Sequence, residues 1–217
     1  LVYFDELLKS KQQKNKEPVI KSKQKTILVA PTWGDNSMLS QVGFKPLKLL
    51  LDEGLSVILR PHPQSFVSDA ELMQDIEIQC SKYDSITIDK TPNAQDAMQQ
   101  ADIMLGDASG IIFDFAFIYE KPIIAFNDTL NESRLLELFE INDAQHDTIQ
   151  VWEVENKHKV ATEMSIKDID NLPKLVIQIL DSYSVNNMKN FRDESLFNYG
   201  TAGKATASQL KQLLNEI

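Results

Sequence analysis

Short apolar runs alternate with longer segments of helical period between Thr26 and Phe126 of this 217-residue chain. The apolar runs are rich in Val, Ile and Leu and nearly continuous, as in strands that are buried on both faces. This alternation is typical of a parallel sheet whose strands are joined by crossover helices. We therefore predict strands at 26–30, 56–60, 85–88, 103–105 and 122–126.

Apolar positions at helical spacing predict four helices between these strands, at 45–52, 69–82, 94–100 and 110–119. Gly54, just beyond the first of them, suits a helix C-terminal stop. After Phe126 the pattern weakens. There we expect a helix at 132–139, a sixth strand at 148–152, a helix at 172–183 and a closing helix at 204–216. The fold class predicted is α/β, a Rossmann-like parallel sheet with helices on both faces.

The first 25 residues differ from the rest, so we predict a linker or tail at 1–25 and one domain at 26–217. Residues 1–8 are typical of a helix end, or of a tail packed on something absent. Seven lysines between Lys9 and Lys25 are opposed only by Glu17. This segment is either a solvated linker or a contact for an anionic membrane surface or polymer. Because the chain starts at Leu1 rather than Met, we expect it to be part of a longer protein.

Composition narrows the classes of partner. The formal net charge of −10 argues against nucleic acid, which requires a basic face. The single cysteine, Cys80, excludes an internal disulfide and predicts a reducing compartment, the cytoplasm. No apolar run reaches the about 18 residues of a membrane span. No signal peptide is expected either, because Asp5 and Glu6 interrupt the start of the chain.

Unusual polar residues follow three of the predicted strands. The sequences PTWGD (31–35), PHPQ (61–64) and GDASG (106–110) follow the first, second and fourth strands. In parallel sheets, ligands bind outside the carboxyl ends of the strands. All three segments are therefore expected at one edge of the sheet, where a ligand would bind.

Arg60 and His62 are the predicted catalytic residues. Pro61 and Pro63 stiffen the backbone around His62 and prevent a helix from starting there. Arg60 offers a planar fork that suits phosphate oxygens. A histidine is more often structural than functional, but this strand-end position beside an arginine favours a functional role.

The turn from Gly106 to Gly110 is the predicted phosphate site. Its glycines let a backbone approach a ligand, and Asp107 or Ser109 can cap the helix that follows. The amides at the start of that helix would bind phosphate. The alternative is an ordinary capped turn. Asp114, among three phenylalanines, is expected to have a partner and a structural role.

The remaining candidate residues give weaker evidence for a binding site. Thr32 and Trp33 are predicted substrate-binding residues, with Trp33 equally able to stack on a base or to cover the core. Asp168 and Asp170 are expected to cap the following helix rather than to bind a metal. His146 and His158 have no metal-ligand spacing, and no dinucleotide, Walker or Ser-His-Asp motif occurs. The sequence predicts no metal and no cofactor.

Taken together, ILVAPTW (27–33), LRPHP (59–63) and ADIMLGDASGIIFDFA (101–116) resemble the CDP-glycerol glycerophosphotransferase family, the teichoic-acid and capsule polymerases of bacteria. KPII (121–124) and GKA (203–205) are also similar. The resemblance implies the C-terminal, nucleotide-binding half of a GT-B architecture. It implies that Arg60 and His62 lie near the donor pyrophosphate, and that Asp107, Ser109 and Gly110 hold phosphate or ribose.

The chain also departs from the family pattern. Gly34 stands where the family usually has arginine, and Ala108 and Gly110 stand where it has tyrosine and a second serine. The Gly-Pro-rich motif after Phe126 is absent from the sequence. These departures leave open a donor other than CDP-glycerol, within the nucleotide-diphosphate class.

The expected reaction is attack of an acceptor hydroxyl on the phosphorus next to glycerol, with release of CMP. Arg60, the helix start at Ser109 and a protonated His62 would stabilise the leaving phosphate. The general base is expected in a partner domain that also supplies the polymer or lipid-linked acceptor side. Two alternatives remain: a sugar-nucleotide glycosyltransferase or UDP-sugar epimerase of the same architecture, and a nucleotide-binding module without turnover.

Overall fold

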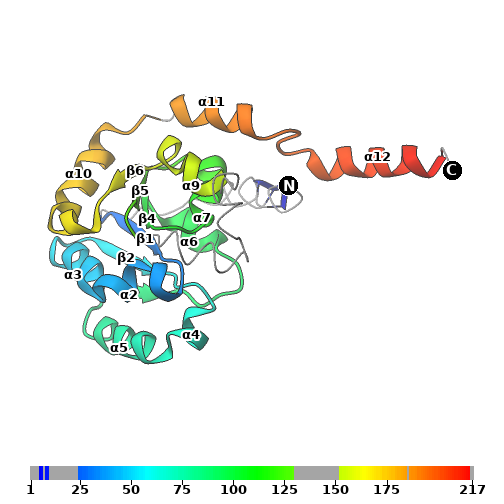
Figure 1. Ribbon diagram of the computed structural model, residues 1–217. Helices are drawn as coiled ribbons and strands as arrows, with labels where there is room; N and C mark the ends of the chain where they lie inside the picture. The colour runs from blue at the N-terminus through cyan, green and yellow to red at the C-terminus, as the bar shows by residue number, and fades with distance from the viewer. Residues whose placement is uncertain (1–4, 7, 10–23, 130–151, 185, 216–217) are drawn as a thin grey trace, which may run out of the picture.

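The computed structural model describes residues 5–6, 8–9, 24–129, 152–184 and 186–215. Its centre is a parallel sheet of six strands in the order β3-β2-β1-β4-β5-β6 (Figure 1). The strands are β1 (Thr26–Ala30), β2 (Ser56–Leu59), β3 (Ile86–Ile88), β4 (Ile103–Gly106), β5 (Ile123–Phe126) and β6 (Thr162–Met164). The predicted α/β, Rossmann-like fold class is confirmed.

The strand order reverses beside β1. The chain runs from β1 outward through β2 to β3, then crosses back to place β4 on the other side of β1. Val29 of β1 is thus opposite Leu59 of β2 and Leu105 of β4. A doubly wound sheet opens a crevice at such a switch point, outside the carboxyl ends of the two central strands. The loops after β1 and β4 lie at this point.

Helices cover both faces of the sheet (Figure 1). Alternation along β1 divides the interior, because successive side chains of a strand point to opposite faces. Ile27 and Val29 join one buried cluster, whereas Leu28 and Ala30 join the other. The first cluster includes residues of α2 (Met38–Val42), α3 (Lys45–Asp52), α5 (Ala70–Cys80) and α10 (Leu172–Ser182). The second includes residues of α6 (Gln95–Gln100), α7 (Ile111–Asp114), η2 (Phe115–Tyr119) and α11 (Asn186–Ser195).

The remaining elements are short, apart from the last helix. They are η1 (Gly34–Asn36), α4 (Ser65–Ser68), α9 (Trp152–Asn156), η4 (Lys157–Lys159), η5 (Ile166–Asn171) and α12 (Ala202–Asn215).

Gly54 ends α3 as predicted. It adopts a φ of +79°, and its N–H donates to the Leu51 carbonyl. Such a left-handed turn, which glycine adopts without a steric penalty, satisfies a carbonyl at the helix end.

Three predictions about the elements are wrong. The sixth strand is Thr162–Met164, and Trp152, the one described residue of the predicted strand 148–152, begins α9 instead. Asp168 and Asp170 lie within η5, and no side chain caps α10, which follows Asn171. Neither Asp107 nor Ser109 caps α7, whose N-cap position is Gly110. Capping depends on local dihedral angles that residue type alone does not set. The predicted helix 132–139 lies outside the described residues.

The predicted helix 110–119 begins as α7 and continues as a π-helix, η2. It ends at Glu120, which has a φ of +54°. A π segment shifts the hydrogen-bond register within a helix and therefore turns its side chains relative to an α-helix. All five residues of η2 are buried, and these are Phe115, Ala116, Phe117, Ile118 and Tyr119.

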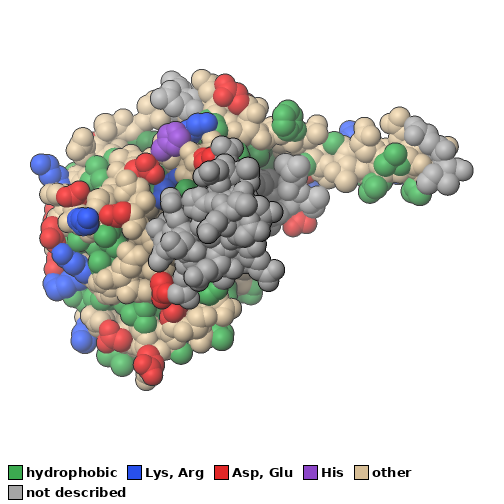
Figure 2. All heavy atoms as spheres, in the orientation of Figure 1, with side chains coloured by type: hydrophobic (Ala, Val, Ile, Leu, Met, Phe, Trp, Pro, Cys, Tyr) green, Lys and Arg blue, Asp and Glu red, His purple; other side chains and the backbone are tan. Residues whose placement is uncertain are grey.

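The first described residues of the chain lie beside the start of α12. The buried Asp5 carboxylate accepts hydrogen bonds from the N–H groups of Ala202 and Gly203, the latter at 2.8 Å. From there α12 extends away from the sheet, with hydrophobic side chains on its surface (Figures 1 and 2). Its exposed leucines are Leu210, Leu213 and Leu214. The division into a linker at 1–25 and a domain at 26–217 stays a prediction.

No described helix combines the length and the apolar character required to cross a membrane.

Candidate functional site

A cleft of about 280 Å³ lies at the carboxyl ends of the strands. Its walls come from the ends of β1 and β2, from the loop after β3, and from the β4–α7 turn. The lining residues are Ala30, Pro31, Arg60, Pro61, His62, Pro63, Pro92, Asn93, Ala94, Ser109, Ile111 and Asp114. The structure thus brings together the three segments that the sequence indicated. It adds the loop after β3, which the sequence analysis missed although it also follows a strand.

His62 lies exposed at the mouth of the cleft, on the stiff turn between two prolines. Its Nδ1 accepts a hydrogen bond from the Gln64 N–H at 3.1 Å, which leaves the Nε2–H as the donor of the neutral ring. Partial burial lowers the pKa of His62 below its ordinary value. This shift favours the neutral imidazole with Nε2–H as its donor, and the protonated His62 stays a prediction.

Trp33 lies next to His62, outside the cleft lining. Its ring centroid lies 6.2 Å from that of His62, with the two planes tilted by 31°. The loop that carries it is anchored, because the Gly34 N–H donates to the Asp69 carboxylate at 2.9 Å. An anchored, partly exposed indole beside the cleft suits stacking on a planar group.

Arg60 lines the cleft, but its guanidinium group already has partners. Nη1 donates to Asp89 Oδ2 at 2.6 Å, and Nη2 donates to the Thr91 carbonyl at 3.0 Å. The ion pair is largely buried, with 13% of the Arg60 side chain and 12% of the Asp89 side chain exposed. These bonds orient the guanidinium group toward the loop after β3, and the contact of Arg60 with phosphate stays a prediction.

Asp107 has no exposed surface. One carboxylate oxygen accepts from the Thr32 N–H at 2.8 Å and the other from the Met38 N–H at 2.9 Å. Burial raises the pKa of Asp107 to about 6, although these backbone hydrogen bonds and that of Ala108 oppose the rise. Asp107 therefore ties the loop after β1 to the end of β4. The predicted direct contacts of Asp107 and Thr32 with substrate stay untested, and the geometry favours a positioning role for both.

Ser109 and Gly110 form the turn that begins α7. Ser109 is half-buried and lines the cleft. No atom lies within 4 Å of the position that a Cβ would occupy at Gly110, so the backbone is open to an approaching group. Gly106 has a different role, because a Cβ there would lie 2.9 Å from Cγ2 of Ile112. The first glycine lets α7 pack on β4, and the second leaves space beside the cleft.

Asp114 is the cleft residue that the sequence analysis assigned to structure alone. Neither oxygen accepts a hydrogen bond from another described residue, and the side chain lines the cleft. Burial raises the pKa of Asp114 to about 6. The expected structural partner is thus absent from the described residues. Its position about one helical turn after Gly110, where the helix starts, was the sequence signal that could have placed it in the site.

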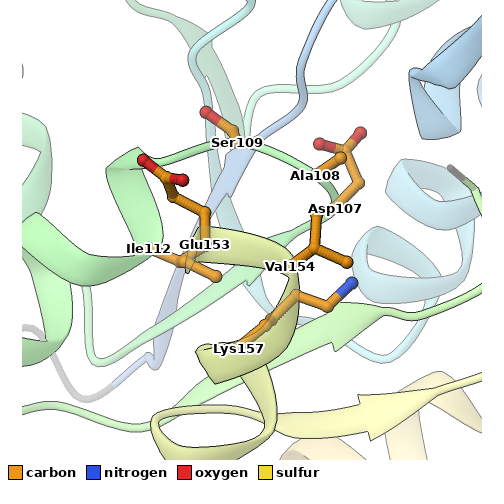
Figure 3. A pocket seen from close by; sticks show the side chains of 7 residues that line it. All are labelled: Asp107, Ala108, Ser109, Ile112, Glu153, Val154 and Lys157. Carbon is orange, nitrogen blue, oxygen red and sulfur yellow. The ribbon is translucent and has the colours of Figure 1, made fainter. Parts of the chain in front are cut away.

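A second hollow, of about 10 Å³, lies between the β4–α7 turn and α9 (Figure 3). Figure 3 shows the Lys157 side chain extending toward Asp107, whereas the Ser109 hydroxyl points away from it. The Lys157 ammonium is buried and donates to the Phe126 carbonyl at 2.8 Å. A volume near that of one water molecule is too small for a substrate. The Lys157 ammonium instead provides a positive charge that interacts with Glu163, Asp107 and Asp128.

Within the described ranges, no group of three or more His, Cys, Asp or Glu side chains could hold a metal ion. His158 lies exposed on η4, away from the cleft lining, and His146 lies outside the described residues. The expectation of no metal and no cofactor stays a prediction.

A family model described as CDP-Glycerol:Poly(glycerophosphate) glycerophosphotransferase matches residues 2–135, more than half of the chain. The chain belongs to this glycerophosphotransferase family. The match contains the ends of β1 to β4 and α7, and hence every residue that lines the cleft. A search of curated proteins found no match.

Solved structures share the fold of this glycerophosphotransferase family member. UDP-GlcNAc 2-epimerase from Neisseria meningitidis, bound to UDP-GlcNAc, has a TM-score of 0.50 and 16% identity, covering 99% of this chain and 51% of the epimerase. The Methanocaldococcus jannaschii UDP-GlcNAc 2-epimerase, in complex with UDP-GlcNAc and UDP, has a TM-score of 0.50 and 13% identity. The match covers 87% of this chain and 51% of the epimerase. S. aureus MnaA with UDP has a TM-score of 0.50 and 17% identity. The match covers 89% of this chain and 46% of MnaA.

The glycerophosphotransferase-family chain therefore spans about half the length of these three structures. This relation agrees with one Rossmann-like half of a GT-B architecture, the fold class that the resemblance implied. At identities below 25%, the likeness concerns the fold alone.

Proposed function

We propose that this chain is the C-terminal, donor-binding domain of a transferase that moves glycerol phosphate from CDP-glycerol to a growing polymer and releases CMP. The polymer would be a teichoic-acid-like or capsular chain, built at the cytoplasmic face of the membrane. The family match supports the reaction class. The observation that carries the proposal is the cleft at the switch point, which His62 and Ser109 line, with Trp33 beside His62.

Each cleft residue has a role that its geometry permits. The Nε2–H of His62 donates to a donor phosphate oxygen, and the Ser109 hydroxyl donates to another. Trp33, which lies beside His62, offers an aromatic face on which a planar group of the donor can stack. The open backbone at Gly110 lets the phosphates approach the turn. Hydrogen bonds from fixed groups stabilise the charge that develops on the leaving phosphate.

In the proposed step, an acceptor hydroxyl oxygen forms a bond to the phosphorus next to glycerol. The bond from that phosphorus to the bridging oxygen breaks, and its electron pair leaves with CMP. The hydroxyl proton passes to a general base, which we assign to the acceptor-side domain. Transfer of this kind depends on positioning and charge stabilisation more than on covalent chemistry.

A transfer assay tests this division of labour. The 217-residue chain alone, incubated with radiolabelled CDP-glycerol and a polymer acceptor, should incorporate no label. The same chain joined to an acceptor-side domain should incorporate it. Robust incorporation by the chain alone would place the general base within these residues and contradict the division.

A further inference from the structure

The Arg60 side chain leaves the end of β2 and runs toward the loop after β3. Besides its bonds to Asp89 and the Thr91 carbonyl, Nη1 lies 3.4 Å from Thr91 Oγ1. A largely buried ion pair of this kind is costly to open, because removing one partner leaves an uncompensated charge. The guanidinium group is therefore held against the loop after β3 by both terminal nitrogens.

Asp89 fixes the same loop with its second oxygen. Oδ1 accepts from the Thr91 N–H at 3.0 Å and from the Thr91 hydroxyl at 2.6 Å. The Asp89 N–H donates to the Leu59 carbonyl and so continues the pairing of β3 with β2. Burial acts to raise the pKa of Asp89, but hydrogen bonds from Thr91 and Arg60 lower it below its ordinary value. The carboxylate stays ionised at neutral pH, and both oxygens are bound to the loop.

This arrangement sets one wall of the cleft. Pro92 and Asn93 follow Thr91 directly and line the cleft, as Ser109 does. The ends of β3 and β4 lie three strand spacings apart, which is about 14 Å at about 4.8 Å for each spacing. The loop after β3 spans part of this separation, because Ala94 directly after it packs in the same buried cluster as Ile112 and Phe113 of α7. A nucleotide with its phosphates at the β4 turn can therefore place its nucleoside against Pro92 and Asn93.

We propose that Asp89 and Thr91 are positioning residues, which together with Arg60 hold the loop at 89–93 as the nucleoside-facing wall of the donor site. Arg60 then supports binding through Asp89 and makes no direct phosphate contact. This inference rests on the proposed function of the cleft as a nucleotide site. It assigns a role to a loop that no sequence motif had indicated.

Calorimetric titration of the 217-residue chain with CMP and with CDP tests the proposal. Asp89→Asn and Arg60→Met should each lower the affinity for both ligands, by about tenfold, and leave the CDP-to-CMP ratio unchanged. The double variant should be no weaker than either single variant, because both substitutions release the same loop. Thr91→Val should act in the same direction, and since Thr91 is exposed this variant should fold if the others do not. Lys48→Met is the matched control, because Lys48 is exposed, pairs with Asp52 on α3 and does not line the cleft.

A direct phosphate contact by Arg60 would give a different pattern. Arg60→Met would then weaken CDP much more than CMP, while Asp89→Asn would free the guanidinium group and preserve or strengthen CDP binding. That result would overturn the proposal, as would variants that melt earlier yet bind both ligands normally. If the unaltered chain binds neither CMP nor CDP, the proposed function itself fails, and the inference fails with it.

Discussion

The indole of Trp33 lies beside the imidazole of His62, so the loops after β1 and β2 are in contact next to the cleft. A hydrogen bond anchors the loop or ring on each side of this contact. The Asp69 carboxylate fixes the Trp33 loop through the Gly34 N–H, and the Gln64 N–H fixes His62 through Nδ1. The pair therefore presents one flat aromatic surface and one hydrogen-bond donor without further rearrangement.

Replacement of His62 by alanine should weaken donor binding. The loss of a hydrogen bond to a charged phosphate corresponds to about 1–3 kcal/mol. The melting temperature should barely change, because the side chain is exposed at a strand end. Calorimetry with CDP-glycerol and a thermal melt on the same preparation measure both quantities.

His158→Ala provides the control, since His158 is exposed on η4 and does not line the cleft. A His62→Ala variant that unfolds earlier but binds CDP-glycerol normally would make His62 a structural residue. The assignment of the donor site would then lose its main hydrogen-bond donor.

Asp107→Ala should destabilise the fold by about 2–4 kcal/mol. The substitution leaves the buried N–H groups of Thr32 and Met38 without their acceptors and opens a small cavity. Denaturant unfolding of the variant and the unaltered chain measures this difference. Unchanged stability with a loss of donor affinity would instead indicate that Asp107 contacts the ligand directly, as the sequence first suggested.

Asp114→Asn should stabilise the chain at pH 7. The pKa of Asp114 is raised to about 6, so the folded state holds this proton more tightly than the unfolded state. The stability that the bound proton of Asp114 contributes is thus fully present below about pH 4 and is lost as the pH rises to about 6. Above that pH, the ionised carboxylate should cost about 1–3 kcal/mol relative to asparagine. In thermal melts between about pH 4.5 and 7.5, the melting temperature of Asp114→Asn should exceed that of the unaltered chain by a difference that grows with pH.

A gap that stays constant across this range would show that Asp114 ionises in the folded protein as readily as in the unfolded chain. Asp107 titrates in the same direction and keeps a residual pH dependence in both proteins. The difference between the two melting curves therefore isolates Asp114.

Gly106→Ala should disturb the packing of α7 on β4, whereas Gly110→Ala should disturb the approach of a ligand to the backbone. A methyl group at Gly106 meets Ile112 and should cost about 1–3 kcal/mol of stability. At Gly110 the methyl group meets no protein atom, so stability should be maintained while the phosphates lose their approach to the backbone. Melting temperatures and CDP-glycerol affinities of both variants measure the contrast. Normal donor binding by Gly110→Ala would remove Gly110 from the site.

The central sheet could be predicted from the sequence because its strands are buried on both faces. β1 and α3 have the predicted bounds, and the other four predicted strands differ by a residue or so at their ends. A strand with two buried faces has a continuous apolar run, which is visible without any tertiary information. β6 has only one buried residue, Met164, so its sequence carries no such signal.

The positions of the cleft loops could be predicted, but not the partners of their side chains. Asp107 follows a strand as a ligand-binding residue would, yet its burial depends on how closely the β1 loop approaches β4. Arg60 follows β2 in the same way, and its pairing with Asp89 depends on the register of β3 against β2. These relationships join residues that are 29 or more positions apart in the sequence. Local pattern therefore located the site and could not distinguish ligand contacts from supports.

Calorimetric titration of the 217-residue chain with CDP-glycerol, with CMP, UDP-GlcNAc and NAD titrated in parallel, tests whether the cleft is a cytidine-nucleotide donor site. We expect CDP-glycerol and CMP to bind at millimolar concentration or below and to compete for one site, and we expect NAD not to bind. Replacement of His62 should weaken both cytidine ligands. Clear binding of UDP-GlcNAc, with no binding of either cytidine nucleotide, would contradict the claim and assign the cleft to a sugar-nucleotide enzyme.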